Sequence, residues 1–133
     1  MTDNENTLAR FYSHYRNRDW TALAGLTSPD AVWRQAASLP WAGEWRGLDG
    51  FAAMLKKIDE SLALTVVSTR LSPHSAGVLV EVDATFTARP TGREIAMRVL
   101  ELYRVENGQV FGADAFYFDT HAIVELHEGT ESR

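Results

Sequence analysis

The stretch IAMRVLELYRVENGQVFGADAFYF, residues 95–118, holds two apolar runs on either side of Asn107-Gly108. Asn-Gly between two alternating apolar runs is the strongest short signal for a two-residue hairpin turn. Counting outward from this turn, Glu101 falls opposite Asp114. The sequence therefore predicts a β-hairpin with these two carboxyls on one face of a sheet, about 5 Å apart at Cβ.

A second turn signal extends this sheet toward the N-terminus. The Pro-Thr-Gly at 90–92 separates the hairpin from an alternating strand at 78–88. A three-residue loop there places Glu81 opposite Glu101, with Asp83 two residues further along the same face. Like charges placed directly opposite each other destabilise a sheet, unless water surrounds them or one carboxyl keeps its proton. The acidic row is consistent with a solvated face and also with an acid–base site.

Composition limits the class of protein. The chain has 133 residues, 45% hydrophobic and 11% aromatic, which fits one domain, residues 1–133, with a single buried core. A net charge of -5 argues against nucleic acid and against an anionic membrane as partners. The first residues lack the basic and apolar regions of a signal peptide, and no apolar stretch approaches 18 residues. We therefore expect a cytoplasmic protein.

The sequence implies no cofactor and no metal. There is no cysteine, so disulfides, thiolate ligands and cysteine nucleophiles are excluded. The four histidines lack the short spacing of a zinc pair. The glycines near 43–50 lack the lysine and the strand-to-helix context of a phosphate-binding loop.

The order of the predicted elements indicates the fold class. Helical spacing and capping residues predict helices over about 8–15, 20–26 and 48–58, with Asn6-Thr7 and Asp19 as caps for the first two. Strand patterns cover about 31–36, 65–71, 78–88, 95–105 and 110–118, with turns at 28–30 and 72–74, a loop at 37–47, and a frayed polar tail after Leu126. Helices separate from a mostly antiparallel sheet predict an α+β domain.

Both faces of the predicted sheet are apolar. One face packs on the helices, and the other would leave a large apolar patch exposed on a monomer. We therefore expect a homodimer that covers the outer face of the sheet.

Short motifs along the chain carry a family resemblance. They are LARFY at 8–12, RDW at 18–20, AVW at 31–33, GEWRG at 43–47, LYRVENGQV at 102–110 and YFD at 117–119. Their order resembles that of SnoaL-like and ketosteroid-isomerase-like proteins of the nuclear transport factor 2-like superfamily, over about residues 6–126. The resemblance implies a cone-shaped fold, with N-terminal helices packed on a curved, mostly antiparallel sheet. It does not imply one activity, because this fold hosts several.

The resemblance also suggests roles for particular residues. Glu101 matches the strand position where ketosteroid isomerases keep a protonated acid that hydrogen-bonds the substrate oxyanion. The general-base position of those enzymes matches Gln35, and their oxyanion tyrosine matches Phe11, with Tyr12 one residue away.

Two related groups point to other acids. Limonene-epoxide-hydrolase-like proteins place an aspartate and an arginine two residues apart on one strand, and those positions match Glu81 and Asp83, so the arginine is missing here. Their remaining aspartate matches Ala115 or Phe116, next to Asp114. In SnoaL-like cyclases an aspartate on the late strands acts as general acid–base, a role that Asp114 or Asp83 could fill.

From these observations the sequence predicts a cofactor-independent isomerase or cyclase that acts on a small, hydrophobic, oxygenated molecule by carboxyl acid–base catalysis. The alternatives are a non-catalytic ligand-binding or dimeric interaction module and an epoxide-hydrolase-like enzyme. The predicted catalytic residues are Glu101, Asp114 and Asp83. The predicted substrate-binding residues are Tyr12, Trp33, Gln35, Trp41, Trp45, Glu81, Met97, Val99, Phe116 and Phe118.

Overall fold

The computed structural model describes residues 1–131 and confirms the α+β class. Its helices are α1 (Asp3–Arg16), α2 (Trp20–Leu26), α3 (Gly47–Asp59) and α4 (Thr120–Glu131). Its strands are β1 (Thr27–Gln35), β2 (Gly43–Arg46), β3 (Leu62–His74), β4 (Gly77–Ala88), β5 (Glu94–Glu106) and β6 (Gln109–Tyr117).

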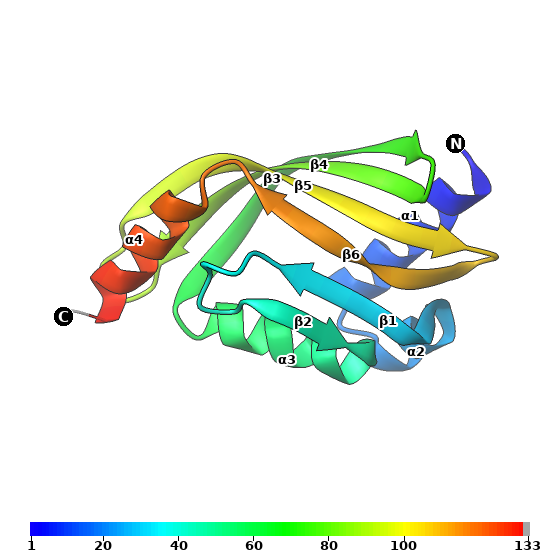
Figure 1. Cartoon of the computed structure of the whole chain (residues 1–133), viewed down its shortest axis with the longest axis horizontal. Coiled ribbons are helices and arrows are strands. Elements are labelled where there is room, and N and C mark those ends of the chain that lie inside the picture. Colours follow the sequence, from blue (N-terminus) through cyan, green and yellow to red (C-terminus); the bar gives the residue numbers. More distant parts are fainter. Residues whose placement is uncertain (132–133) are drawn as a thin grey trace.

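The strands form one curved sheet in the order β2-β1-β6-β5-β4-β3. Neighbouring strands are antiparallel except β1 and β6, which are parallel. Figure 1 shows the sheet arching over α1 and α3, with α4 at the end of the sheet away from the N-terminus. The concave face therefore looks toward the helices, and the convex face looks away from them.

Capping side chains set the first two helix starts. Thr2 and Glu5 form a reciprocal capping box, so α1 begins at Asp3 and not after the predicted Asn6-Thr7 cap. Asp19 caps α2 as predicted, because its Oδ1 accepts the Ala22 N–H at 3.1 Å.

Other element boundaries differ from the prediction because tertiary pairing overrides local signals. The predicted turn at 28–30 lies within β1, the predicted loop at 37–47 contains the short edge strand β2, and the predicted turn region at 72–74 belongs to β3. The predicted frayed tail is helical as far as Glu131, because α4 buries Ile123 and Leu126 against the sheet. Residues 132 and 133 lie outside the described residues.

The β5–β6 hairpin has the predicted turn but a different register. Asn107 and Gly108 have φ values of 50° and 77°, as a two-residue hairpin turn requires. Beyond the turn, two residues of β6, at 111 and 112, lie opposite the single residue Arg104 of β5. This β-bulge shifts every later pair by one, so Glu101 lies opposite Ala115.

The predicted pairing of Glu101 with Asp114 is therefore wrong. Asp114 pairs with Leu102, and neighbouring positions on a strand point to opposite faces. Glu101 lies on the concave face and Asp114 on the convex face.

The β4–β5 register also differs from the prediction by one residue. The loop has four residues, 89–92, because the Ala88 N–H bonds the Arg93 carbonyl and the Gly92 N–H bonds the Ala88 carbonyl, each at 2.8 Å. Val80, and not Glu81, consequently lies opposite Glu101. The predicted row of acids does not form.

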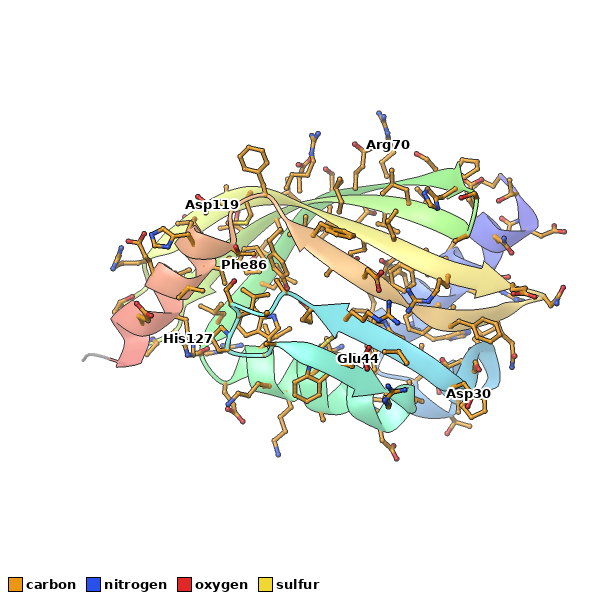
Figure 2. All side chains as sticks on the ribbon, viewed as in Figure 1. Asp30, Glu44, Arg70, Phe86, Asp119 and His127 are labelled. Atoms are coloured by element: carbon orange, nitrogen blue, oxygen red, sulfur yellow. The ribbon has the colours of Figure 1, made fainter. Side chains whose placement is uncertain are left out.

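The two faces of the sheet differ in chemistry. The concave face buries alternate residues of β4, from Val78 to Phe86, and the convex face carries ion pairs such as Arg70–Glu81 at 3.0 Å. Figure 2 shows this split: Phe86 points toward the helices and Arg70 away from them. Within residues 1–131, no helix is long and apolar enough to cross a membrane.

Candidate functional site

A cavity of about 240 Å³ lies between the concave face of the sheet, α1 and α3. Most of its lining is aliphatic or aromatic. The apolar lining residues are Trp33, Phe51, Met54, Leu55, Ile58, Leu64, Val66, Val82, Ala84, Phe86, Val99, Ala113 and Ala115. The polar lining residues are Tyr12, Tyr15, Arg16, Gln35, Thr69, Glu101, Tyr103 and Tyr117.

Small residues on β6 leave room for this cavity. Ala113 pairs with Trp33 of β1 on one side and with Tyr103 of β5 on the other. Ala115 pairs with Glu101, and Gln35 directly follows Arg34, which pairs with Asp114 of β6. Large side chains of β1 and β5 thus stand on both sides of a floor made by two alanines.

Glu101 is partly buried in this apolar space and hydrogen-bonded to a tyrosine. The Tyr12 hydroxyl of α1 donates to Glu101 Oε1 at 2.9 Å. Burial raises the pKa of the Glu101 carboxyl, and the Tyr12 hydrogen bond opposes that rise. The pKa of Tyr12 is raised well above its ordinary value by burial and by the Glu101 charge, so Tyr12 stays a hydrogen-bond donor.

The second oxygen of Glu101 is available to a ligand. Within the described chain, Oε2 makes no hydrogen bond, and no arginine or lysine forms an ion pair with this carboxyl. When Glu101 is protonated it can donate from this oxygen, and when ionised it can accept a proton there. This is the arrangement of an acid–base group facing a cavity.

Tyr103 and Trp33 complete the polar wall next to Glu101. Burial and the Glu101 charge raise the pKa of the Tyr103 hydroxyl, while the Tyr12 hydroxyl and the Trp33 indole act in the opposite direction. Trp33 Nε1 is buried and makes no hydrogen bond of ordinary geometry to any residue in 1–131. It nevertheless lies close enough to the Tyr103 hydroxyl to oppose the rise in the pKa of that group. The Trp33 ring packs on Phe51, with ring centroids 4.5 Å apart.

A second polar group faces the cavity from β1 and β6. Trp41 Nε1 donates to the Tyr117 hydroxyl at 3.3 Å, and that hydroxyl donates to Gln35 Oε1 at 3.0 Å. Gln35 Nε2 lies 3.4 Å from Met54 Sδ, which is a weak acceptor. Burial raises the pKa of Tyr117, and the Glu101 charge adds to that rise.

Five of the predicted site residues line the cavity. They are Tyr12, Trp33, Gln35, Val99 and Glu101. Together they supply the only carboxyl that lines the cavity among residues 1–131, its tyrosine donor, and one amide.

The other predicted acids lie on the convex face. Asp83 accepts from Arg98 Nε and from Ser68 Oγ, each at 3.1 Å, and these bonds lower its pKa. Asp114 bonds Arg104 at 3.0 Å and Glu81 bonds Arg70 at 3.0 Å. The one-residue register shifts described above are the reason that these acids lie outside the cavity.

Five predicted apolar residues also lie outside the cavity lining. Phe116 and Phe118 are on or beside the convex face, with exposed fractions of 52% and 86%. Met97 packs against the core without lining the cavity. Trp41 is 1% exposed, and its indole N–H donates to the Tyr117 hydroxyl. Trp45 Nε1 in turn donates to the Trp41 carbonyl at 3.1 Å.

Sequence reasoning missed several lining residues, most importantly Tyr103, Tyr117 and Arg16. Tyr103 follows Glu101 by two residues on β5 and shares its face whatever the register, whereas the correct register of β6 would have placed Tyr117 on that face as well. A glycine inside a strand pattern, here Gly112, is the signal that could have predicted the bulge.

Comparisons with known proteins agree with this architecture. An NTF2-like protein from Burkholderia xenovorans LB400 is 22% identical and covers 93% of this chain and 95% of its own, with a TM-score of 0.83. TerC co-crystallised with polyporic acid is 19% identical over 96% of this chain and 99% of its own, with a TM-score of 0.79. A candidate polyketide cyclase from Xanthomonas campestris pv. campestris is 15% identical over 92% and 95%, with a TM-score of 0.72.

At these identities the likeness shows the shared fold. The comparison with curated proteins found no match. The model of the SnoaL-like domain matches residues 8–113, from the first helix through β6, and so includes Tyr12, Gln35 and Glu101. The chain therefore belongs to the SnoaL-like domain family.

Proposed function

We propose that this protein is a cofactor-independent isomerase or cyclase that moves a proton on a small, hydrophobic, oxygenated molecule. One observation carries the proposal: Glu101 is a partly buried carboxyl that lines an apolar cavity, with one oxygen bonded to Tyr12 at 2.9 Å and the other free of hydrogen bonds within the described chain. Burial makes the Glu101 carboxylate a stronger base than an exposed glutamate, because it raises the pKa of the group.

The chemistry needs only one such group. The Glu101 carboxylate removes a proton from a carbon next to a substrate carbonyl. The electron pair of the C–H bond forms a C=C bond, and the π pair of the carbonyl moves to its oxygen to give an enolate. Return of the proton to another carbon of a conjugated enolate gives an isomer. Attack of the enolate carbon on a second carbonyl of the same molecule closes a ring, and Glu101 then protonates the new alkoxide.

The apolar lining supports a hydrophobic ligand. Trp33 and Phe51 form an aromatic wall, and the alanine floor leaves space for a flat molecule. TerC, which shares this fold, was co-crystallised with polyporic acid, an observation about that protein that agrees with a small-molecule role here. The epoxide-hydrolase alternative has no such support, because Glu81 and Asp83 form ion pairs on the convex face.

Hydrogen exchange tests the proposal without a known product. A panel of aryl ketones is incubated with the protein in D₂O, and NMR follows deuterium uptake next to the carbonyl. We expect exchange with some ketones, and a loss of about 10²- to 10⁴-fold in Glu101→Gln. Glu81→Gln, on the convex face, is the matched control and should keep the wild-type rate. Equal exchange rates in wild type and Glu101→Gln would contradict the proposal.

A second candidate function is ligand binding without catalysis. The composition of the cavity lining favours it. Glu101 is the one carboxyl that faces the cavity from residues 1–131, and the position of the isomerase base carries Gln35. This alternative predicts ketone binding with no deuterium uptake in the wild-type protein.

We also propose that the protein is a homodimer through the convex face of the sheet. The half-exposed Phe116 lies there, near the more exposed Phe118, and ion pairs such as Arg98–Asp83 and Arg104–Asp114 lie beside them. An apolar centre with a polar margin is the usual composition of a subunit interface.

A further inference from the structure

The hydrogen bonds around Gln35 run in one direction. The Trp41 indole N–H can only donate, so the Tyr117 oxygen must accept from it at 3.3 Å. The Tyr117 hydroxyl then uses its own proton toward Gln35, at 3.0 Å. Only the amide oxygen of Gln35 can accept that proton, so the oxygen faces Tyr117 and the NH₂ group faces elsewhere.

This arrangement leaves the Gln35 NH₂ group with little to donate to. Its neighbour at 3.4 Å is Met54 Sδ, a weak acceptor, and no stronger acceptor bonds it within residues 1–131. Gln35 and Met54 both line the cavity. The site therefore has an amide whose donors are aimed at cavity-lining groups and whose acceptor is already occupied.

Gln35 and Glu101 stand on opposite sides of the cavity floor. Ala115 of β6 pairs with Glu101 of β5 on one side. On the other side of β6 lies β1, in which Arg34 pairs with Asp114 and Gln35 is the next residue. Adjacent strands are about 4.8 Å apart, so the two side chains start about 10 Å from each other across the alanine. A flat ring system placed over Ala115 has one edge near each of them.

From this geometry we infer that Gln35 is a specificity-determining residue that donates a hydrogen bond from its NH₂ group to a carbonyl oxygen of the ligand, opposite the edge that contacts Glu101. Tyr117 and Trp41 are positioning residues that hold the amide in this orientation. The ligand class is a flat, conjugated molecule with a hydrogen-bond acceptor at the β1 edge. This inference rests on the proposed function, in which the same carbonyl oxygen carries the enolate charge while Glu101 holds the proton.

The division of roles follows from which polar atoms are free. Glu101 is able to exchange a proton, whereas a glutamine amide does not titrate at neutral pH. A donor that is already oriented stabilises negative charge on the ligand oxygen without having to reorganise. Replacing Tyr117 would remove the bond that fixes the amide, so the NH₂ group would be free to turn away.

Two probes of the same shape test the inference. Acetophenone carries a carbonyl where α-methylstyrene carries a C=CH₂ group. Their dissociation constants are measured from the chemical shifts of the Ala113 and Ala115 backbone amides, which report binding on the cavity floor. The second readout is the ¹³C shift of the labelled acetophenone carbonyl, which moves downfield when the oxygen accepts a hydrogen bond.

We expect bound acetophenone in the wild type to show a downfield carbonyl shift relative to the probe in cyclohexane. In Gln35→Met, which keeps the side-chain size without the donor, the shift should be lost. The preference for acetophenone over α-methylstyrene should also fall by about fivefold or more, since an unsatisfied polar group costs about 1 kcal/mol or more and 1.4 kcal/mol is tenfold. Tyr117→Phe should weaken both signals, and Trp20→Phe, which changes an exposed aromatic of α2 outside the cavity lining, should change neither.

Other outcomes overturn the inference in distinguishable ways. An unshifted carbonyl signal of acetophenone bound to the wild type contradicts the inference. This result needs no variant, so it holds even if Gln35→Met fails to fold. A shift that persists in folded Gln35→Met and disappears in Glu101→Gln assigns the donor to Glu101, which leaves the proposed site intact but removes this role of Gln35. Failure of both probes to perturb Ala113 and Ala115 rejects the cavity as a site for flat apolar molecules, and the proposed function with it.

Discussion

Glu101 and Asp83 are acids of neighbouring strands with opposite pKa shifts, and the sheet face is the cause. The pKa of Glu101 is raised by burial on the concave face. The pKa of Asp83 is lowered by hydrogen bonds from Arg98 and Ser68 on the exposed convex face. The same chemical group is therefore desolvated on one side of the sheet and paired with arginine on the other, and the proposed proton transfer needs the first of these environments.

The raised pKa of Glu101 has a consequence for stability. Between the ordinary glutamate value of 4.5 and the folded value, the native state binds more protons than the unfolded state. The free energy of unfolding contributed by this group therefore falls as pH rises through that interval. We expect the stability of wild type relative to Glu101→Gln to decrease from about pH 4.5 upward in urea titrations.

The comparison with Glu101→Gln is needed because other acids act in the opposite direction. Glu5, whose pKa is lowered by its capping bonds to Thr2, adds stability that is lost as pH falls. A difference between wild type and Glu101→Gln that stays constant with pH would show that Glu101 is not desolvated.

The β-bulge of β6 keeps Asp114 out of the cavity. Gly112 has a φ of 101°, and a Cβ there would overlap the Val32 carbonyl of β1. We expect Gly112→Ala to lower the free energy of unfolding by more than about 2 kcal/mol, because it combines backbone strain with a backbone clash. Gly25→Ala in α2, where a Cβ meets nothing within 4 Å, is the control and should be neutral or slightly stabilising in the same urea titration.

The ion pairs of the convex face should matter little to the cavity. Asp114 and Arg104 are about one-third exposed, at 30% and 32%, so we expect Asp114→Asn to cost about 1 kcal/mol or less. We expect its rate of deuterium exchange to equal that of wild type in the ketone assay. A loss of exchange as large as that of Glu101→Gln would mean that the convex-face acid takes part in the chemistry.

Local sequence signals predicted the hairpin turn but not the register of its strands. Asn107-Gly108 fixes the turn through its own backbone preferences. Gly112 marks the place of the bulge within the strand, but the close approach of Gly112 to Val32 joins residues 80 positions apart in the sequence, so the register itself depends on a long-range contact. Because one residue of slip exchanges the two faces of a strand, Glu101 lines the cavity, whereas Asp83 and Asp114 lie on the convex face.

The same reasoning applies to the elements that the sequence did not reveal. β2 is an edge strand held by pairing with β1, and α4 is stabilised by burying Ile123 and Leu126. Both depend on contacts with residues outside the element rather than on the propensity of the element's own residues. The alternating strand β4 and the capped helix α2 were predictable because their own residues determine them.

The molecule has a concave face, which holds the cavity, and a convex face, through which the proposed dimer forms. We expect light scattering to give twice the chain mass of 14.9 kDa at micromolar concentration. Phe116→Asp should give the mass of one chain, because it places a charge among apolar side chains of the interface. Trp20→Asp changes an exposed aromatic of α2 and should leave the dimer intact. A wild-type protein with the mass of a single chain would contradict the dimer.

A cytoplasmic location stays a prediction from composition, and the expected single domain over 1–133 stays a prediction from length.

The proposed catalysis depends on how the layers enclose Glu101, since the same side chain on the convex face would titrate like any exposed acid.

The ionisation of Glu101 tests that dependence most directly. An NMR titration of the side-chain carboxyls, with Glu101 assigned from the signal missing in Glu101→Gln, reports its pKa in the folded protein. We predict titration clearly above the ordinary value of 4.5, and a further rise in Tyr12→Phe, because the Tyr12 hydrogen bond opposes the effect of burial. Titration of Glu101 at the ordinary value would mean a solvated carboxyl and would contradict an acid–base site in this cavity.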